Sequence, residues 1–246
     1  MNKFKHCDKL DANPLMCLII GATGCGKTWL LFQMLTTEGI LDFEKLVIYT
    51  TTLEQPYFQL LKHGFQNGLS KSTINSLFKA YEELNMRCDQ IPEFCFRASH
   101  EESNRGSRVE VLLTNNMKDL TSLNDGERKP KTLVIFDDCV TNSNQQTQRE
   151  IFTRGRHNNC QGIYLSQNFY GLDRRYIRKN ANIFILFSQS QRSLTAILQD
   201  IDHGMERSEF KELAANQWYN PKEFRYILIN TRKPRDRRCS TDIFSH

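Results

Sequence analysis

The hydrophobic pattern of the chain consists of short apolar runs separated by longer stretches of mixed polarity. The runs are five to seven residues long and rich in Ile, Leu, Val and Phe, which is typical of strands buried on both faces of a sheet. Most of the intervening stretches have a helical pattern. We therefore predict an α/β fold, a mostly parallel sheet covered by helices on both faces, with strands at 15–20, 45–50, 109–113, 132–136, 161–166, 181–187 and 224–230.

Two longer segments between the predicted strands differ in character. The region 56–108 is mostly helical and polar in pattern. Within it, residues 70–86 carry apolar side chains at helical spacing, which predicts a packed helix rather than a cofactor motif, at Ile74, Leu77, Phe78, Tyr81 and Leu84. The segment 115–131 is rich in Asn, Asp, Gly and Pro and is predicted to be a surface loop.

The length of 246 residues fits one α/β domain. We predict an N-terminal extension at 1–12, the domain at 13–230 and a basic tail at 231–246. The longest apolar runs, 15–20 and 183–187, are far shorter than the roughly 20 residues that span a bilayer, and mean hydropathy is −0.55. We therefore expect no membrane span, and the polar N-terminal residues do not resemble a signal peptide.

The cysteines and the net charge indicate only a reducing compartment and a possible polyanionic partner. The eight cysteines include no C-x-x-C pair, so we predict free thiols in a reducing compartment. A net charge of +5 is mildly basic. The basic residues gather in three clusters, which suit a polyanion or a solvated surface equally well: Arg154 and Arg156; Arg174, Arg175, Arg178 and Lys179; and Arg232, Lys233, Arg235, Arg237 and Arg238.

A glycine-rich motif follows the first predicted strand. The pattern G-x-x-x-x-G-K-T, between an apolar strand and an apolar helix, is typical of a phosphate-binding loop. Glycines let successive backbone N–H groups turn toward an anion, and the helix N-terminus adds partial positive charge. We predict that ATP is bound here, with Lys27 on the β- and γ-phosphates and the Thr28 hydroxyl on Mg²⁺, by Gly21, Ala22, Thr23, Gly24, Cys25, Gly26, Lys27 and Thr28.

A second motif, TLVIFDD, is an apolar strand that ends in two carboxylates. Ligands of parallel sheets lie at the carboxyl ends of the strands. We predict that Asp137 holds Mg²⁺, directly or through water, and that Asp138 orients or deprotonates the attacking water, which favours hydrolysis over phosphoryl transfer.

Two further candidates lie between and beyond these motifs. Gln167 ends the strand expected beside the phosphate loop, where its amide would hydrogen-bond the γ-phosphate or the lytic water; the alternative is a polar strand end with no catalytic duty. Arg154 and Arg156 end a predicted helix near Gly155. Either is a candidate arginine finger for a neighbouring subunit's site, or part of a cluster that the helix dipole stabilises.

The motifs GATGCGKT, VIFDD, FTRGRHNN and YLSQN, in this order, closely resemble those of the poxvirus-type DNA-packaging ATPases of the FtsK/HerA superfamily, which has related forms in virophages and Polinton or Maverick elements. The resemblance covers roughly residues 13 to 200. It implies a RecA/FtsK-HerA-like P-loop NTPase fold, ATP and Mg²⁺ as cofactors, and a homo-oligomeric ring that drives double-stranded DNA into a preformed capsid. It also implies an intracellular place of action, at a nuclear or cytoplasmic assembly site or in the virion.

The resemblance implies roles for the candidate residues: Walker A for Lys27 and Thr28, Walker B for Asp137 and Asp138, sensor for Gln167, and arginine finger for Arg154 or Arg156. Two departures stand out. No sizeable domain precedes the loop, so a capsid-docking surface is expected within the core or the tail. The second Walker B carboxylate is Asp where many relatives carry Glu. The tail would contact DNA, a capsid protein or nothing.

Three other functions are compatible with a phosphate-binding loop. A P-loop kinase would pass the γ-phosphate to a small acceptor, but it should carry an acceptor pocket and an arginine-rich lid. A helicase-like DNA translocase would act without a capsid. A non-catalytic nucleotide-binding scaffold is disfavoured because both Walker motifs are intact. We expect an ATPase that moves DNA.

Overall fold

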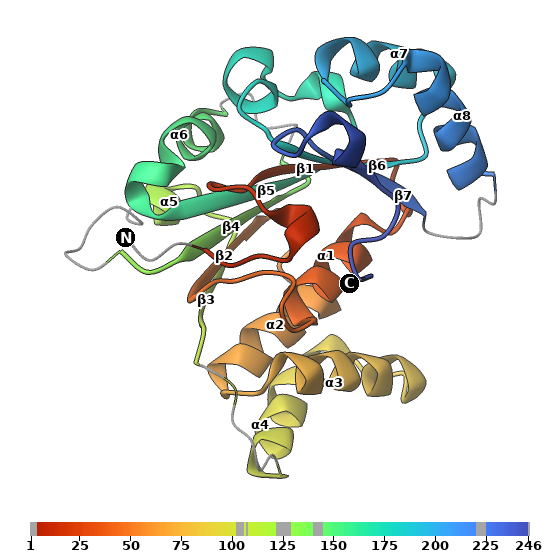
Figure 1. The fold of residues 1–246 in the computed structure, drawn as a ribbon. Helices are drawn as coiled ribbons and strands as arrows, with labels where there is room; N and C mark the ends of the chain where they lie inside the picture. Colours follow the sequence, from red (N-terminus) through yellow and green to blue (C-terminus); the bar gives the residue numbers. More distant parts are fainter. Residues whose placement is uncertain are drawn as a thin grey trace.

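The fold is built on one central sheet (Figure 1). The computed structural model describes residues 4–101, 106, 108–121, 129–139, 145–219 and 225–245. Within them the sheet has eight strands: β1 Met16–Ile20, β2 Lys45–Thr50, β3 Glu110–Thr114, β4 Thr132–Asp137, β5 Cys160–Ser166, β6 Ile183–Phe187, β7 Tyr226–Asn230 and β8 Cys239–Ser240. The first seven strands confirm the prediction, and β8 was not predicted.

The strand order is β3-β2-β4-β5-β1-β6-β7-β8. All pairs from β3 to β6 are parallel, and β7 and β8 add antiparallel strands at one edge. The predicted mostly parallel sheet is therefore confirmed. Because β5 pairs with both β1 and β4, the carboxyl ends of these three strands lie side by side, and this arrangement positions the candidate site.

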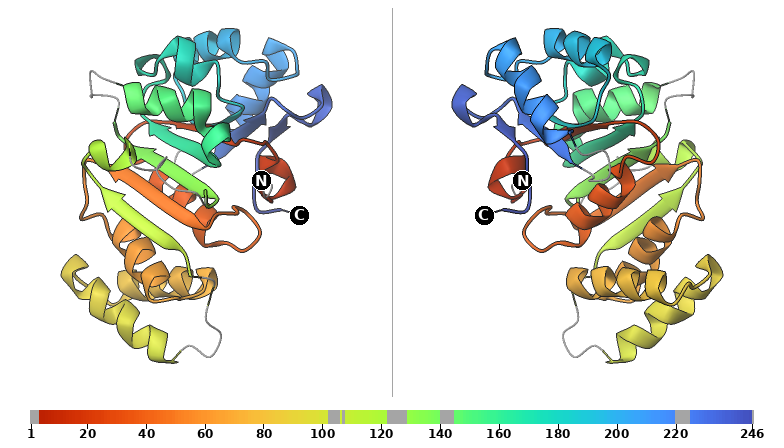
Figure 2. Two further views of the ribbon diagram at one scale, coloured as in Figure 1. Left: turned by 90° about the vertical axis from the view of Figure 1, so that its left-hand side faces the viewer. Right: turned by 90° about the vertical axis from the view of Figure 1, so that its right-hand side faces the viewer.

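Helices cover both faces of the sheet, as predicted. In Figure 1, α1 to α4 lie below the sheet and α6 to α8 above it, and Figure 2 shows the same two layers from the sides. The helices are α1 Lys27–Thr36, α2 Pro56–Gln66, α3 Lys71–Glu83, α4 Ile91–Glu101, α5 Lys118–Thr121, α6 Gln146–Arg154, α7 Gln191–Asp200 and α8 Arg207–Gln217.

The two layers follow from the alternation of side chains along each strand. Cys17 and Ile19 of β1 pack into one cluster with apolar residues of α1 to α4. Leu18 and Ile20 pack into the other cluster with residues of α6, α7 and α8. Since both faces are buried, the strands need apolar residues at every position, which explains the continuous runs in the sequence.

Local signals set the helix ends. The Ser70 hydroxyl accepts a hydrogen bond from the backbone N–H of Thr73 and caps α3, and Ser190 caps α7 in the same way. Pro56 occupies the first turn of α2, where its missing N–H has no helical partner to lose. The prediction of a packed helix at 70–86 is confirmed for α3.

Two details of the sequence predictions were wrong, one in the helix at 70–86 and one in the loop at 115–131. Leu84 follows the last residue of α3 and its side chain is 66% exposed, because the helix ends before the residue can turn inward. The predicted loop 115–131 contains the short helix α5, whose Leu120 is buried against the sheet. The middle of that loop, residues 122–128, lies outside the described residues.

The two predicted flanking segments pack against the domain. Leu10 and Ala12 of the N-terminal segment belong to the core, and the side chain of Ile243 near the C-terminus is buried. The backbone N–H of Ile243 donates to the hydroxyl oxygen of Tyr226 at 3.0 Å. The sequence of the tail did not predict this packing, because a single buried residue produces no apolar periodicity.

Two further findings bear on the sequence expectations. All eight cysteines are free thiols, as predicted. Across the described ranges, none of the helices combines the length and the apolar content that a membrane crossing needs.

Candidate active site

The phosphate-binding loop joins β1 to α1, as predicted. Its backbone adopts the left-handed conformation at Gly24, with φ of 76°, and at Gly26, with φ of 95°. Residues with a Cβ atom rarely adopt these angles. Glycine at both positions therefore allows the backbone to curl around the first turn of α1.

The first glycine of the loop is needed for space. A Cβ atom at Gly21 would lie 2.5 Å from Sγ of Cys25 and 2.6 Å from Cβ of Phe187, both closer than packed atoms approach. The N–H of Gly21 donates to the carbonyl oxygen of Ser166 at 3.1 Å. The start of the loop is thus tied to the end of the neighbouring strand β5.

Lys27 is the first residue of α1, and its ammonium group points back over the loop. Its Nζ donates to the carbonyl oxygens of Gly21 at 2.7 Å and Ala22 at 2.8 Å. An ammonium group has three donors, so one remains for a ligand after these two bonds. The loop carbonyls hold the charge in position, and the helix N-terminus beneath it adds partial positive charge.

Asp137 ends β4 and is nearly enclosed, with 5% of its surface exposed. Its Oδ2 accepts a hydrogen bond from the hydroxyl of Thr50 at 3.1 Å. Burial raises the pKa of Asp137 to about 6, and the neighbouring Asp138 carboxylate adds to the rise, while the hydrogen bond from Thr50 and the charge of Lys27 oppose it. Bringing a cation to this carboxylate would relieve the unfavourable burial of its charge.

Asp138 leaves the sheet in a strained turn. Its φ of 50° is unusual for a residue other than glycine and costs roughly 1–3 kcal/mol where it is imposed. The turn exposes the carboxylate, and Oδ1 accepts a hydrogen bond from Nε2 of Gln167 at 3.2 Å. The structure therefore brings together the predicted carboxylate and the predicted amide.

The residues present fit the predicted cofactors. Hydroxyl and carboxylate oxygens, which Thr28 and Asp137 supply, are the hard ligands that Mg²⁺ takes. The left-handed glycines give the loop the curvature that lets backbone N–H groups converge on a phosphate. Both the charge and the donor types of this edge of the sheet suit a magnesium nucleotide.

The predicted arginines lie elsewhere. Arg154 ends α6, and a Cβ atom at the next residue, Gly155, would lie 2.7 Å from the carbonyl oxygen of Cys160 and 3.0 Å from the methyl group of Met16. Cys160 and Met16 begin their strands, so this helix end lies at the amino edge of the sheet. The phosphate loop follows the other end of β1, roughly 15 Å away along a strand of five residues. Arg154 and Arg156 are exposed and cannot reach the loop of their own chain.

Three residues near the carboxylates were not predicted from the sequence. Thr50 and Gln55 both hydrogen-bond the side chain of Asp137. Cys139 is buried directly after the two carboxylates, and its thiol donates to the carbonyl oxygen of Asp137. The three consecutive threonines after the second apolar run were the available signal, since hydroxyls at a strand end face the ligand edge.

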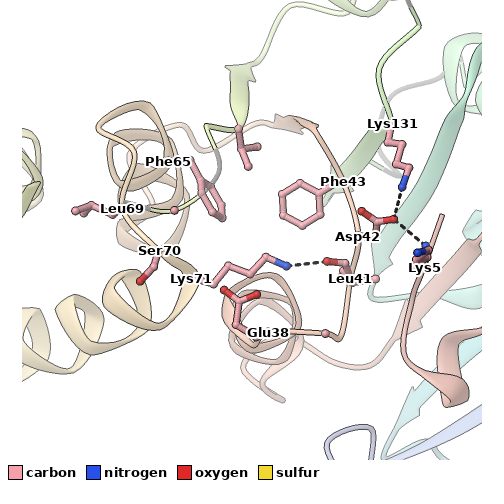
Figure 3. A pocket seen from close by; sticks show the side chains of 13 residues that line it. Lys5, Glu38, Leu41, Asp42, Phe43, Phe65, Leu69, Ser70, Lys71 and Lys131 are labelled. Atoms are coloured by element: carbon pink, nitrogen blue, oxygen red, sulfur yellow. Dashed lines mark hydrogen bonds and ion pairs between the residues drawn. The ribbon is translucent and has the colours of Figure 1, made fainter. Parts of the chain in front are cut away.

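A cavity of about 400 Å³ lies at the opposite, amino edge of the sheet (Figure 3). Buried Phe65 and Leu69 form part of its wall, and Lys5, Lys71 and Lys131 line it together with Glu38 and Asp42. None of the residues that line it belongs to the phosphate loop. This cavity is therefore separate from the candidate active site.

The fold is the α/β fold of P-loop NTPases. The DNA-packaging ATPase B204 from Sulfolobus turreted icosahedral virus is similar, with a TM-score of 0.53 and 14% identity over 91% of this chain and 94% of that one. The genome packaging NTPase B204 from Sulfolobus turreted icosahedral virus 2, in complex with AMP, matches with a TM-score of 0.50 and 12% identity, over 94% of this chain and 98% of that one.

A third structure extends the comparison. VirB4 of Thermoanaerobacter pseudethanolicus matches with a TM-score of 0.50 and 14% identity, over 88% of this chain and 87% of that one. At such identities the likeness establishes a shared fold. No family model matches the chain, and no curated protein sequence does.

Proposed function

We propose that this protein is a magnesium-dependent ATPase that moves double-stranded DNA, and that it packages a viral or virus-like genome into a capsid. The observation that carries the ATPase assignment is the convergence of five side chains at one edge of the sheet. Lys27 is held over a glycine loop, Asp137 is buried beside Thr50, and Asp138 is bonded to Gln167.

The loop and Lys27 would bind the nucleotide. The ammonium group, fixed by two carbonyl oxygens, directs its remaining N–H toward the β- and γ-phosphates. Thr28 and Asp137 would hold Mg²⁺, which when bound neutralises charge that develops on the phosphates. Thr50 orients the carboxylate of Asp137 and keeps one of its oxygens from rotating away.

Asp138 and Gln167 would act on the attacking water. The exposed carboxylate accepts a proton or a hydrogen bond from the water, and the amide of Gln167 holds that carboxylate in one orientation. Gln167 follows β5, which lies between β1 and β4, and this order supports a role in which its side chain would sense the γ-phosphate as well as Asp138. This arrangement favours hydrolysis over transfer to an organic acceptor.

The assignment to DNA movement rests on two supports. The chain has the fold of a protein described as a DNA-packaging ATPase and covers nearly all of it. Its motifs also resemble the poxvirus-type packaging ATPases in order and spacing. A homo-oligomeric ring is part of the proposal, because Arg154 and Arg156 lie at the edge of the sheet opposite the phosphate loop of their own chain.

The proposal is tested by phosphate release from ATP with Mg²⁺, measured with and without long linear duplex DNA. We expect stimulation by DNA and displacement of a third strand from a triplex substrate as the motor moves. Phosphate release that is insensitive to DNA would contradict the motor. A phosphorylated small acceptor in place of free phosphate would identify a kinase instead.

A further inference from the structure

The three basic clusters of the sequence lie in different surroundings. The tail cluster is partly tied down within the chain, since Lys233 pairs with Asp8 at 2.5 Å and Arg238 pairs with Asp202 at 2.6 Å. Arg154 and Arg156 lie at the amino edge of the sheet, away from the phosphate loop. The remaining cluster, Arg174, Arg175, Arg178 and Lys179, follows Gln167 in the sequence. It differs from the other two clusters because exposed tyrosines accompany its basic residues.

We name this region the Tyr–Arg surface. It comprises the turn of 3-10 helix Phe169–Gly171, the π-helical turn Arg174–Arg178 and Arg149 of α6, against which the π-helical turn packs. Two tyrosines are exposed on it, Tyr170 at 47% and Tyr176 at 38%. Lys179, Asp173 and Asp200 adjoin this surface, and with them it carries five cations against two carboxylates, the cations being Arg149, Arg174, Arg175, Arg178 and Lys179.

Guanidinium groups pack against the exposed rings. The Arg178 guanidinium lies 5.2 Å from the ring centre of Tyr170, and it pairs with Asp200 at 2.8 Å. The guanidinium carbons of Arg149 and Arg175 lie 5.7 Å and 5.5 Å from the ring centre of Tyr176. The rings of Tyr170 and Tyr176 and the ion pairs with Asp173 and Asp200 thus restrict the arginine side chains, which lowers the entropy lost when an anion binds them.

The same segment is bonded to the candidate active site. The Ser166 carbonyl oxygen accepts from Gly21 N–H of the phosphate loop, and its hydroxyl bonds to the backbone of Asn168. The Asn168 side chain then accepts from the backbone N–H of Tyr170 at 2.9 Å. Gln167, between them, holds Asp138. Five consecutive residues therefore connect the phosphate loop and the catalytic carboxylate to Tyr170.

We propose that the Tyr–Arg surface binds the phosphate backbone of duplex DNA, and that residues 166–170 transmit this binding to Asp138. The proposal rests on the proposed function and names the surface through which DNA stimulates hydrolysis. Exposed arginines and tyrosine hydroxyls are the groups that proteins use on DNA phosphates. When DNA binding displaces Tyr170, the hydrogen-bonded turn at Asn168 would displace Gln167 as well. The Asp138 carboxylate, which accepts a hydrogen bond from Gln167, would then change position.

The binding arm of the test compares two double variants that remove the same charge. In Arg174→Ala with Arg175→Ala, Asp200 keeps Arg178 as its partner, so the fold should hold. The matched control is Arg232→Ala with Arg235→Ala, two exposed arginines of the tail. Fluorescence anisotropy with a labelled 30-base-pair duplex is measured across a salt series.

We expect the slope of log affinity against log salt to fall by about two for the surface variant and to stay at the parent value for the control. If the surface variant keeps the parent slope and affinity, the Tyr–Arg surface does not bind DNA. If the control loses the binding instead, DNA lies on the tail. A parent that binds a single strand but no duplex would also overturn the proposal.

The coupling arm uses Asn168 as a positioning residue. Asn168→Ala removes the acceptor for Tyr170 N–H, whereas Asn168→Asp keeps an acceptor oxygen at the same position of the turn. We expect Asn168→Ala to bind duplex with the parent affinity but to lose DNA stimulation of phosphate release, and Asn168→Asp to regain it. Full stimulation in Asn168→Ala would exclude this route. Failure of the parent protein to bind or respond to DNA would instead contradict the proposed function itself.

Discussion

The two edges of the sheet both place lysines beside carboxylates, yet they are arranged differently. At the amino edge, the cavity of Figure 3 holds an ion pair of Lys131 with Asp42 at 2.6 Å, and the same carboxylate accepts from the backbone N–H of Lys5. Lys71 donates to the carbonyl oxygen of Leu41 at 2.7 Å and lies over the Phe43 ring. The charge of Asp42 is thus neutralised by Lys131, while Lys71 donates to a backbone carbonyl.

At the carboxyl edge the charges are held apart. Asp137 and Asp138 accept hydrogen bonds from the neutral side chains of Thr50 and Gln167, and Lys27 donates to backbone carbonyls. Because these charged groups are oriented but do not neutralise one another, they remain able to interact with a charged ligand. The candidate active site is therefore identified better by its uncompensated charges than by the size of a cavity.

The largest expected effect comes from exchanging a lysine at each edge. Lys27→Ala should lower phosphate release at least roughly 100-fold, because the β- and γ-phosphates lose their fixed cation. Lys131→Ala should keep the parent turnover. It should instead lower the free energy of unfolding by roughly 1–3 kcal/mol, since it leaves the half-buried Asp42 without its cation.

Phosphate release and denaturant unfolding, measured on both variants, check this pair. Equal loss of turnover in the two variants would remove the distinction between the edges. The Lys27→Ala variant should unfold close to the parent midpoint, because its ammonium group bonds to two backbone carbonyl oxygens and not to a buried carboxylate.

A second test removes a charge and keeps the hydrogen bond. In Asp138→Asn the amide oxygen can still accept from Gln167, so the turn should persist. We expect nucleotide affinity near the parent value, while turnover falls by roughly 10²- to 10⁴-fold because no carboxylate remains to act on water. Nucleotide binding by calorimetry and phosphate release provide the two readouts. Turnover at the parent rate would exclude Asp138 from this role.

A third test asks whether two chains complete one site. Lys27→Ala and the double variant Arg154→Ala with Arg156→Ala should each be inactive, for different reasons. In a mixed ring an intact loop can lie beside an intact arginine, so part of the activity should return on mixing. If the variants co-assemble by size-exclusion chromatography and no mixture turns over ATP, the finger is excluded at Arg154 and Arg156. It is then sought among Arg174, Arg175 and Arg178.

A smaller effect concerns the thiol inside the loop. Cys25 is half-buried against Gly21 and Phe187, and burial raises the pKa of its thiol, so alkylation should be slow at neutral pH. An added group has no space in the loop, and alkylation should inactivate the parent enzyme. Bound ATP should slow the reaction further, and Cys25→Ala should be insensitive. Mass spectrometry with and without nucleotide measures it, and equal rates would count against protection.

The smallest effect lies in the N-terminal segment. Nδ1 of His6 accepts from the Asp42 N–H, so Nε2 donates to Oε1 of Gln161, and only the neutral ring can do both. Burial lowers the pKa of His6 below its ordinary 6.5, although the hydrogen bond with Gln161 and the charges of Asp42 and Asp11 oppose the shift, and Lys131 adds to it. The unfolded chain therefore binds the proton first, and the contribution of His6 to stability is lost as the pH falls below about 6.5.

His6→Gln provides the comparison. Unfolding free energies between pH 7.5 and 5.5 should fall more steeply for the parent than for this variant, in which no ring can titrate. Parallel pH profiles would show that the buried ring does not contribute. Both proteins share all other titrating groups, so the difference between their profiles reports His6 alone.

Much of the candidate active site could be predicted from the sequence. The glycine loop requires left-handed angles at Gly24 and Gly26 that glycine adopts most readily, so the spelling of the motif specifies the backbone. The carboxylates and Gln167 end apolar runs, and parallel strands bring their carboxyl ends to one edge. The sequence could not predict the contact between Thr50 and Asp137, because it depends on the pairing of β2 with β4, whose residues are far apart in the sequence.

The sequence by itself determined the seven strands from β1 to β7, the packed helix α3 and the edge of the sheet at which chemistry is possible, because apolar runs, glycines and caps act through local physics. The tertiary structure alone decided the strand order, which places Gln167 between the loop and Asp138, and the distance that separates Arg154 from the loop of its own chain. It also joined β8 to the sheet and satisfied the lysines of the amino edge. Such pairings arise from packing energies between distant segments, which no local pattern records.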